Sequence, residues 1–443
     1  MVHRSIAKIV SWNLENEAAC ASAARISTTE GSACEIFEAA RTDPRNAALI
    51  EKVMRSGHSS VIEHAVFTIA FQDVSAFVEQ YLIECRLASF TVKSRRYVDF
   101  SGLGYHVPPE LEGGCLSLYR EYMDGLFHGY QALLDHGIPR EDARFILPYA
   151  FCSNLYCTLN ARELLLLIRS VRCGRGRDVP ELQDLAQQLT QQLAQLFPVL
   201  LSQSSDSAAQ GPDSGEGIWS ASSHTIEPVQ AKDAGRVRLV QSPADPATIL
   251  EMAFATARPG RSGPLDLEQL VHDPRPRELE QLSYTFLLSD VTLSCVTHLA
   301  RHRMQSILIP PIQSVDHSRC IVPDTVLQAP AAKDCYLRIL ARAGELLERA
   351  KDHDALRRFG YYFALSGNLM DVMTTMNARE SLLFVQLRAC SRAQWEIRRV
   401  TERMLVLLRD DFPELFRSYG PGCLLLGTCP EGRLSCGRPV RRT

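Results

Sequence analysis

The chain lacks any long hydrophobic run. Nowhere among its 443 residues do about 18 apolar residues follow one another, which is the length that a membrane-spanning helix needs. The first residues, Met1–Trp12, begin with basic side chains but contain no apolar stretch of the kind found in a secretory signal. We therefore expect a soluble protein of the cytoplasm.

An excess of charge of one sign is also missing. The 48 Lys and Arg residues nearly balance the 51 Asp and Glu residues, and the formal net charge is −3. This balance gives no general attraction to nucleic acid, so any anion site has to be local. The hydrophobic share of 46% is ordinary for a globular protein, and a chain of this length favours two domains.

The fourteen cysteines include no Cys-x-x-Cys pair, the spacing of many zinc and redox motifs. Without a secretory signal, reduced thiols are favoured over a disulfide framework. Cys423, Cys429 and Cys436 stand among glycines and prolines near the end of the chain. With Cys390 or a histidine as fourth ligand they would suit tetrahedral zinc, and reduced thiols in a polar tail are the alternative.

The most informative feature that is present is an internal repeat. Asn160-Ala161-Arg162-Glu163 recurs as Asn377-Ala378-Arg379-Glu380, an offset of 217 residues. The same offset relates Arg86 to Arg303, Ser89 to Ser306, Asp73 to Asp290, Tyr119 to Tyr336 and Cys173 to Cys390. A constant register over roughly a hundred residues predicts two copies of one unit of about 200 residues.

We place copy one at residues 1–201 and copy two at residues 236–420. Residues 202–235 between them are rich in Ser, Asp, Gly, Ala and Gln. Such a segment buries too little apolar surface to offset its ordering entropy, so a flexible linker is predicted. Residues 421–443 form a tail rich in Cys, Gly and Pro.

Both copies combine few strands with many helices. Each opens with a strand-like run, at Ser5–Val10 and at Val237–Val240. In copy one, Ala65–Phe71 has the length and β-branched content of a buried strand. Asp73 or Ser75 would cap the helix that follows, which is expected to end near Arg86.

Copy two repeats this plan. We expect a strand near Tyr284–Leu288, a helix cap at Ser289 or Asp290, and a helix that contains Val291 and runs to Arg303. Residues 183–201 have the apolar spacing of an amphipathic helix. The predicted fold class is α+β.

Two arginines flank a histidine in copy two, Arg301-His302-Arg303. Their guanidinium groups around an imidazole form a dense set of donors that suits phosphate or an electron-rich ring. Cations at a helix end also complement the helix dipole, and this plainer explanation stays open. Copy one has Glu84-Cys85-Arg86 here and lacks the paired guanidinium groups.

Copy one instead carries Ser94-Arg95-Arg96-Tyr97. A hydroxyl, two arginines and a tyrosine in four residues could hold a nucleotide phosphate, although a solvated basic turn would have the same composition. Copy two has Pro311-Ile312-Gln313-Ser314 at these positions and cannot form the same site.

Gly57–His64 in copy one contains two histidines, a glutamate and two serines. The spacing suits neither one helix face nor a known zinc pattern, so hydrogen bonding to a bound cofactor is the better explanation. The copy-two counterpart, 274–281, has lost both histidines.

Together these segments resemble the flavin-dependent thymidylate synthases. That family carries Arg-His-Arg and Ser-x-Arg-Tyr, an upstream Gly-His-x-Ser-x-x-Glu-His, then Ala-Arg-x-x-Leu-Pro, Asn-Ala-Arg, and Leu-Arg before Ala-Gln-Trp-Glu-Ile. The matching segments here are Arg301–Arg303, Ser94–Tyr97, Gly57–His64, Ala143–Pro148, both Asn-Ala-Arg elements, Leu387–Arg388 and Ala393–Ile397. The resemblance implies two tandem copies of the family's fold, each a small sheet packed with several long helices, and neither copy carries every motif.

The resemblance implies a role for each matching residue. Arg301, His302 and Arg303 would contact the flavin, and Arg301 also the nucleotide. Ser94 and Arg96 would hold the nucleotide, and Arg388 would polarise its pyrimidine ring at N3. Flavin contacts are further implied for His58, Ser60, Asn160, Arg162, Asn377 and Arg379, and a nucleotide contact for Arg144.

Family members build each site between subunits, so the resemblance implies one nearly complete set of residues here. It consists of Arg301–Arg303 and Arg388 from copy two with Ser94 and Arg96 from copy one. The opposite set would combine Glu84, Cys85 and Val171 with Pro311 and Gln313, and would be inactive unless Arg172 takes the place of Val171. The family is tetrameric, so two of these chains would supply four units as a homo-oligomer.

The implied activity is reductive methylation of deoxyuridylate (dUMP) to thymidylate (dTMP). FAD reduced by NADPH would deliver a hydride, methylenetetrahydrofolate would supply the carbon unit, and Ser94 would bind rather than attack. The family's asparagine in this loop is Leu308 in copy two and Thr91 in copy one, and Ile307–Pro311 is apolar. A methylase of another pyrimidine nucleotide, or a non-catalytic flavin- or nucleotide-binding relative, is therefore the alternative.

Overall fold

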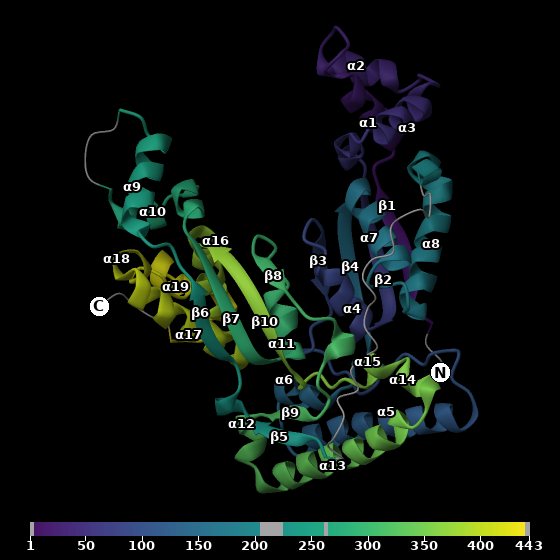
Figure 1. The fold of residues 1–443 in the computed structure, drawn as a ribbon, viewed down its shortest axis with the longest axis vertical. Coiled ribbons are helices and arrows are strands. Elements are labelled where there is room, and N and C mark those ends of the chain that lie inside the picture. Colours follow the sequence, from purple (N-terminus) through teal and green to yellow (C-terminus); the bar gives the residue numbers. More distant parts are fainter. Residues whose placement is uncertain (1–3, 204–224, 261–264, 439–443) are drawn as a thin grey trace. The chain divides into compact units, whose positions relative to one another are not determined.

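The computed structural model describes residues 4–203, 225–260 and 265–438 (Figure 1). The chain forms two compact units. Unit 1 contains Met1–Gln131, Pro148–Ile218 and Leu346–Phe363, and unit 2 contains Ala132–Leu147, Trp219–Glu345 and Ala364–Thr443. Each unit thus takes most of one copy and a short segment of the other.

Unit 1 is built on a four-stranded antiparallel sheet in the order β1-β2-β4-β3. Its strands are β1 (Ile6–Trp12), β2 (Val66–Ser75), β3 (Ser89–Val92) and β4 (Cys152–Asn160). Its helices are α1 (Asn16–Arg25), α2 (Ala33–Ala40), α3 (Asn46–Arg55), α4 (Ala76–Ile83), most of α5 (Gly113–Asp135), α7 (Ala161–Cys173), α8 (Pro180–Leu196), α14 (Asp354–Arg357) and α15 (Gly360–Phe363). Alternate residues of β2, Phe67, Ile69 and Phe71, are buried, as expected for a strand that covers a core with one face.

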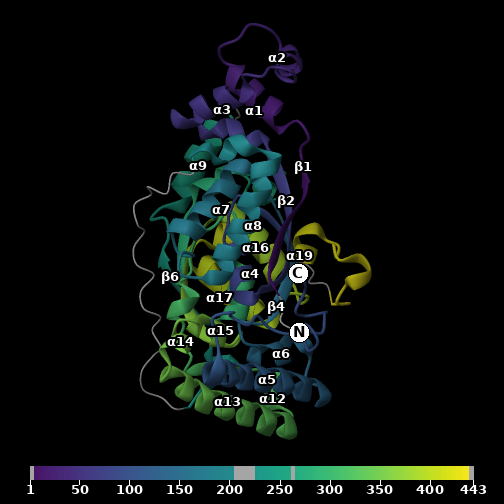
Figure 2. The same cartoon turned by 90° about the vertical axis from the view of Figure 1, so that its right-hand side faces the viewer.

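Helix α8 covers the edge of this sheet along β1 (Figures 1 and 2). The Gln188 amide accepts from the Ala7 N–H at 2.9 Å and donates to the Ser5 carbonyl at 3.0 Å. One helical turn later, the Gln192 amide accepts from the Ile9 N–H at 2.8 Å. These glutamines satisfy backbone groups that an edge strand otherwise leaves exposed.

Unit 2 repeats the sheet in the order β6-β7-β10-β8. Its strands are β6 (Arg236–Gln241), β7 (Ser283–Thr292), β8 (Ser306–Leu308) and β10 (Leu369–Asn377), with β5 (Glu227–Gln230) and β9 (Arg319–Val322) in a separate parallel pair. Its helices are α6 (Arg140–Ala143), α9 (Pro246–Ala257), α10 (Leu267–Val271), α11 (Leu293–Leu299), α12 (Asp324–Leu327), most of α13 (Pro330–Lys351), α16 (Ala378–Arg388), α17 (Trp395–Asp411), α18 (Pro413–Phe416) and α19 (Gly422–Leu426). The mixture of small sheets and helices confirms the predicted α+β class.

A β-bulge marks the repeat at atomic level. Asp73 in β2 has φ 51° and Asp290 in β7 has φ 56°, and no other non-glycine residue in the described ranges has a positive φ. Aspartate tolerates this left-handed conformation better than most residues do. Two positions later, Ser75 and Thr292 cap α4 and α11 by accepting from the N–H of Val78 and Cys295.

Several predicted boundaries differ from the observed ones because the strands continue through this bulge. Val291, predicted to be helical, lies in β7, and the helix cap is Thr292 rather than Ser289 or Asp290. Helix α11 therefore ends at Leu299, short of Arg303. In copy one Ser75 is the cap, as predicted, and the helix ends at Ile83.

Each unit holds a segment of the other copy in its core. In unit 2, Phe145 is fully buried against Ile321 and Leu369, with the Trp395 ring 5.9 Å away. Asp142 accepts from Trp395 Nε1 at 2.7 Å. This segment, residues 132–147, is thus an integral part of unit 2.

Unit 1 contains the reciprocal segment, residues 346–363. Tyr361 packs on Phe77 of α4 with ring centroids 4.4 Å apart. The Tyr362 hydroxyl donates to Glu181 at 2.7 Å. Since both tyrosines are buried, the core of unit 1 requires this part of copy two.

The predicted linker, residues 202–235, is only partly within the described residues, since 204–224 lie outside them. Glu227–Gln230 forms β5, which pairs with β9, and Val229, Ala231 and Ala234 are buried. These apolar side chains make the later part of the segment structured. Over the described ranges, no helix is long and apolar enough to span a membrane.

Candidate active site

Arg301, His302 and Arg303 lie in the turn after α11, and their side chains do not share one environment. Arg301 and Arg303 are exposed, whereas His302 is only 6% exposed. The His302 N–H donates to the Leu299 carbonyl at 3.0 Å, which closes the last helical turn. The structure thus leaves two guanidinium groups at the surface and buries the imidazole between them.

His302 is held by three side chains from α16. Its Nδ1 lies 3.2 Å from Glu380 Oε1, and its Nε2 lies 2.9 Å from Arg388 Nε. The Phe384 ring packs edge-on against the imidazole with centroids 4.7 Å apart. Glu380, Phe384 and Arg388 recur every four residues, so they lie on one face of α16.

Hydrogen-bond chemistry fixes the protonation of this chain of side chains. An arginine N–H can only donate, so His302 Nε2 must accept and carries no proton. The proton is therefore on Nδ1 and is donated to Glu380. Burial, the largest effect, lowers the pKa of His302, and the Arg388 charge acts in the same direction while the Glu380 hydrogen bond opposes it. A neutral imidazole thus orients the Arg388 guanidinium.

Unit 1 has lost this arrangement. Cys85, Leu167 and Val171 occupy the positions of His302, Phe384 and Arg388, although Glu163 remains where unit 2 has Glu380. Burial raises the pKa of the Cys85 thiol to about 12, so this group stays protonated. Unit 1 therefore has no arginine at the position of Arg388 and no histidine to hold one.

Arg172 does not take the place of Val171. Its Nη2 donates to Thr190 Oγ1 on α8 at 2.9 Å. Val171 itself is buried on the core face of α7. The helix has not slipped, and the proposed substitution by Arg172 is wrong for this structure.

Both Asn-Ala-Arg elements begin a helix in the same way. Asn160 and Asn377 accept from the backbone N–H of Glu163 and Glu380 at 2.9 and 2.8 Å. Arg162 Nη1 donates to Glu63 at 2.6 Å, and Arg379 pairs with the equivalent Glu280. These roles account for the repeated letters structurally, and the implied flavin contacts of Asn160, Arg162, Asn377 and Arg379 stay predictions.

The remaining copy-one candidates lie in unit 1. His58 and Ser60 are exposed at the start of the 3-10 helix Ser59–His64. Ser94 and Arg96 are half-buried in a turn after β3, where Ser94 Oγ accepts from the Arg96 N–H at 3.3 Å. Both places are reachable by a ligand, and their roles stay predictions.

Arg144 lies in unit 2 although it belongs to copy one. It is 3% exposed, and its Nε donates to the Glu141 carbonyl at 3.0 Å. Its charge acts to lower the pKa of Glu396 and of Cys295, against the larger effect of burial, which raises both. Tyr361 is the copy-two counterpart and is packed in unit 1. The nucleotide contact implied for Arg144 stays a prediction.

Comparison with known proteins identifies the chain. The sequence profile of the family described as "Thymidylate synthase complementing protein" matches residues 8–199 and 241–414, which together make up most of the chain. The chain belongs to this family. The two matched segments are consistent with tandem copies, and the family predicted from the sequence is confirmed.

Relatives of this chain carry the name flavin-dependent thymidylate synthase. The Geobacter sulfurreducens protein is 36% identical over 137 residues, 29% of this chain and 58% of the relative. The Nitratidesulfovibrio vulgaris protein is 34% identical over 37% of this chain and 72% of the relative. The alignment with the Geobacter protein thus spans little more than half of that relative. Among solved structures, the UMP/dUMP methylase PolB from Streptomyces cacaoi, bound with 5-Br dUMP, is 28% identical with a TM-score of 0.38 and covers 45% of this chain and 94% of that chain.

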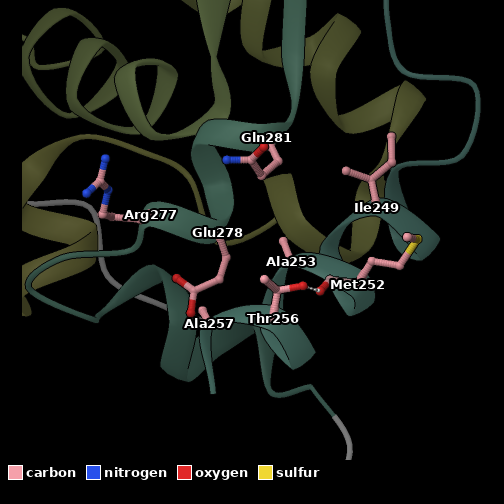
Figure 3. A pocket seen from close by; sticks show the side chains of 8 residues that line it. All are labelled: Ile249, Met252, Ala253, Thr256, Ala257, Arg277, Glu278 and Gln281. Carbon is pink, nitrogen blue, oxygen red and sulfur yellow. Dashed lines mark hydrogen bonds between the residues drawn. The ribbon is translucent and has the colours of Figure 1, made fainter. Parts of the chain in front are cut away.

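A pocket of about 480 Å³ lies in the second family segment (Figure 3). Helix α9 lines it with Ile249, Met252, Ala253, Thr256 and Ala257, and the 3-10 helix Arg277–Gln281 adds Arg277, Glu278 and Gln281. The latter residues are the counterparts of Ser60, Val61 and His64. Neither Arg301, His302 nor Arg388 lines this pocket, so its volume does not define the candidate active site.

Zinc is not supported in this family member. Within the described ranges, no three His, Cys, Asp or Glu side chains are placed to hold one metal ion. Cys390, Cys423, Cys429 and Cys436 all belong to this part of the chain, so the zinc site considered for them is not formed.

Two further buried carboxylates could not be assigned a contact from the sequence, Glu380 and Glu396. Glu380 stood in the repeated Asn-Ala-Arg-Glu element, but only the fold shows that it contacts His302. Glu396 is 2% exposed, and its Oε1 accepts from the Thr292 N–H at 2.8 Å, so it holds the start of α11. Burial, the largest effect, raises the pKa of Glu396 to about 7, although hydrogen bonds from Thr292 oppose it.

Proposed function

We propose that this chain is an FAD-dependent enzyme that methylates dUMP to dTMP with methylenetetrahydrofolate and NADPH. The observation that carries the proposal is the Arg388 guanidinium held at 2.9 Å by a neutral histidine, which is itself held by Glu380. The relatives named flavin-dependent thymidylate synthase support the same reaction class.

The donors in unit 2 fit a flavin chemically. Arg301 and Arg303 are exposed beside a buried, uncharged imidazole, and FAD carries a diphosphate and ring carbonyls that accept hydrogen bonds. In this proposal the flavin contacts of unit 2 are Arg301, His302, Arg303, Asn377 and Arg379, and those of unit 1 are His58, Ser60, Asn160 and Arg162. When bound, FAD would supply the hydride-transfer chemistry.

Arg388 is the proposed catalytic residue. Its guanidinium keeps its charge at any working pH and can stabilise negative charge that develops on the pyrimidine ring. Because Nε is engaged by His302, the plane of the guanidinium is fixed before the substrate arrives. Nucleotide binding is proposed for Ser94, Arg96, Arg144 and Arg301. The prediction that one nucleotide is bound by residues of both copies is not tested by the structure.

One observation favours a second candidate. Leu308 stands where the family has asparagine, and its side chain is 69% exposed in β8. An exposed leucine cannot donate to or accept from a pyrimidine. A methylase of another pyrimidine nucleotide, or a non-catalytic flavin- or nucleotide-binding relative, is therefore the alternative.

A homo-oligomer of two chains in the cytoplasm completes the proposal, because the tandem copies would then supply the four units of the family. Light scattering at twice the chain mass would support this assembly. A monomer that turns over dUMP would contradict it without affecting the proposed reaction.

The reaction is tested on purified chain by its visible spectrum and by release of tritium from C5 of dUMP or UMP. Yellow protein that releases tritium from dUMP, with NADPH and methylenetetrahydrofolate present, is the expected result. Tritium release from UMP alone favours a methylase of another pyrimidine nucleotide. Yellow protein that releases no tritium from either nucleotide favours the non-catalytic flavin- or nucleotide-binding relative. Colourless protein that binds no FAD contradicts the proposal.

A further inference from the structure

A buried ion pair lies directly behind the Ser94–Arg96 turn of unit 1. Arg95 is 5% exposed, and its Nη2 donates to Glu79 Oε1 on α4 at 2.6 Å. Its guanidinium carbon lies 4.6 Å from the centre of the Phe151 ring. Glu79 is fully buried and also accepts from the Ser153 hydroxyl on β4.

Unit 2 fills the same three positions with apolar side chains. The offset of 217 residues relates Glu79, Arg95 and Ser153 to Val296, Ile312 and Met370. All three counterparts are buried, at 1%, 5% and 8% exposure. The fold therefore packs at this place without any charge, and buried ion pairs add little stability over well-packed apolar groups of similar size.

The arrangement in unit 1 also leaves a cost that stability alone does not explain. Arg95 Nη1 is buried and has no hydrogen-bond partner among the described residues. A buried N–H without a partner is destabilising and is uncommon in proteins. An apolar residue, such as the isoleucine of unit 2, would avoid this cost.

The position of Arg95 suggests what offsets it. In the turn Ser94–Tyr97 it is the one buried side chain, and it stands between the two residues proposed to hold the nucleotide. The turn is also held by backbone bonds, from Lys93 N–H to the Asn154 carbonyl at 3.0 Å and from Val98 N–H to the Ser94 carbonyl at 3.0 Å. Anchoring Arg95 to two elements of the core thus fixes the side chains on either side of it.

We propose that Arg95 is a positioning residue, held by Glu79 and Ser153, that orients Ser94 and Arg96 toward the phosphate of a pyrimidine nucleotide. The inference rests on the proposed function, because it takes the nucleotide as the ligand of this turn. It also explains why unit 2, whose equivalent turn has Pro311 and Gln313 at the flanking places, carries the apolar trio.

The test transplants the unit 2 trio into unit 1 as the triple variant E79V/R95I/S153M. Because this trio already packs in the same fold, we expect thermal unfolding and FAD content close to those of the parent chain. Calorimetric titration should show dUMP affinity reduced about tenfold or more, while the affinity for deoxyuridine, which has no phosphate, changes less than about twofold. Unchanged dUMP affinity, or an equal loss for both ligands, would overturn the proposal.

Two further variants keep the test decisive if the triple variant does not fold. Arg95→Lys keeps a cation beside Glu79 and should retain dUMP affinity within about threefold, whereas the uncharged pair E79Q/R95M should lose about tenfold. Equal dUMP affinities of these two variants would contradict a positioning role. Ile312→Val, at the counterpart of Arg95 in unit 2, is the matched control and should change neither affinity.

The double variant S94A/R96A separates this inference from the proposed function. If it leaves dUMP affinity unchanged, the turn does not bind the nucleotide and the proposed function is wrong at this point. If it weakens dUMP binding while the triple variant does not, only the positioning role of Arg95 is wrong.

Discussion

Arg388 Nε donates to His302 Nε2 over 2.9 Å, and this contact joins two segments that are 86 residues apart in the chain. It decides the protonation of the histidine and the orientation of the arginine together. In the other copy both partners have been lost, to Val171 and Cys85. Both copies thus have the same fold, but only copy two has the Arg388–His302 pair.

Replacing Glu380 by alanine removes the acceptor of the His302 Nδ1 proton. The imidazole can then rotate or change tautomer, and Arg388 loses its fixed partner. We expect kcat for dUMP to fall about 10- to 100-fold, in line with ~1.5–3 kcal/mol for a hydrogen bond to a charged group. Glu163→Ala, the same change in unit 1, should leave kcat within about twofold, and an equal effect of both variants would contradict the role of Glu380.

Acidification should break the hydrogen bond between Arg388 Nε and His302 Nε2. Burial lowers the pKa of His302, so the residue is neutral at pH 7 and takes up a proton only below its ordinary value of 6.5. A proton on Nε2 would face the Arg388 guanidinium and remove its acceptor, while Glu380 would still face Nδ1. The rate with dUMP should therefore show an acidic limb with its midpoint below pH 6.5, and stability from this group should be lost over the same range. A pH–rate profile without that limb would contradict the assignment.

Stability near neutral pH should depend on Glu396 with the opposite sign. Folding raises its pKa from 4.5 to about 7, so the protonated form is favoured in the fold. The stability that this form contributes is present below pH 4.5 and is lost as the pH rises through 7. Glu396→Gln should raise the unfolding free energy at pH 8 by roughly 1–3 kcal/mol and change it little at pH 5. Denaturant unfolding at the two pH values measures this, and equal effects at both would contradict the prediction.

The sequence predicted the repeat, the α+β class and the family, because these depend on register, local periodicity and motif spacing. Asn160 and Asn377 also had the pattern of helix caps, and both are caps. The position of α11 was missed because the bulge at Asp290 extends β7, and left-handed backbone at one residue leaves no periodic signal.

The contacts of the candidate site could not be predicted either. That Glu380 meets His302 depends on a helix face turned toward a loop 78 residues away. Phe145 belongs to copy one but packs in the core of unit 2. An apolar sequence pattern predicts that such a residue is buried, but it does not predict which core buries it. Such pairings are set by tertiary packing rather than by local preference.

Removal of metal should have no effect. In the described part of the chain, no three His, Cys, Asp or Glu side chains are placed to hold a metal ion. Dialysis against a chelator should therefore leave the unfolding midpoint unchanged. Cys429→Ser should behave in the same way. A midpoint that falls on chelation and recovers with zinc would contradict this prediction.

The most direct test of the account compares the parent chain with Arg388→Ala and Arg172→Ala. Release of tritium from C5 of dUMP is measured with FAD, NADPH and methylenetetrahydrofolate present, and bound flavin is measured by its absorbance. We expect Arg388→Ala to keep the flavin but to lose about 100-fold or more of the rate, while Arg172→Ala keeps both. Equal rates for Arg388→Ala and the parent chain, or no tritium release by flavin-loaded parent chain, would contradict the account.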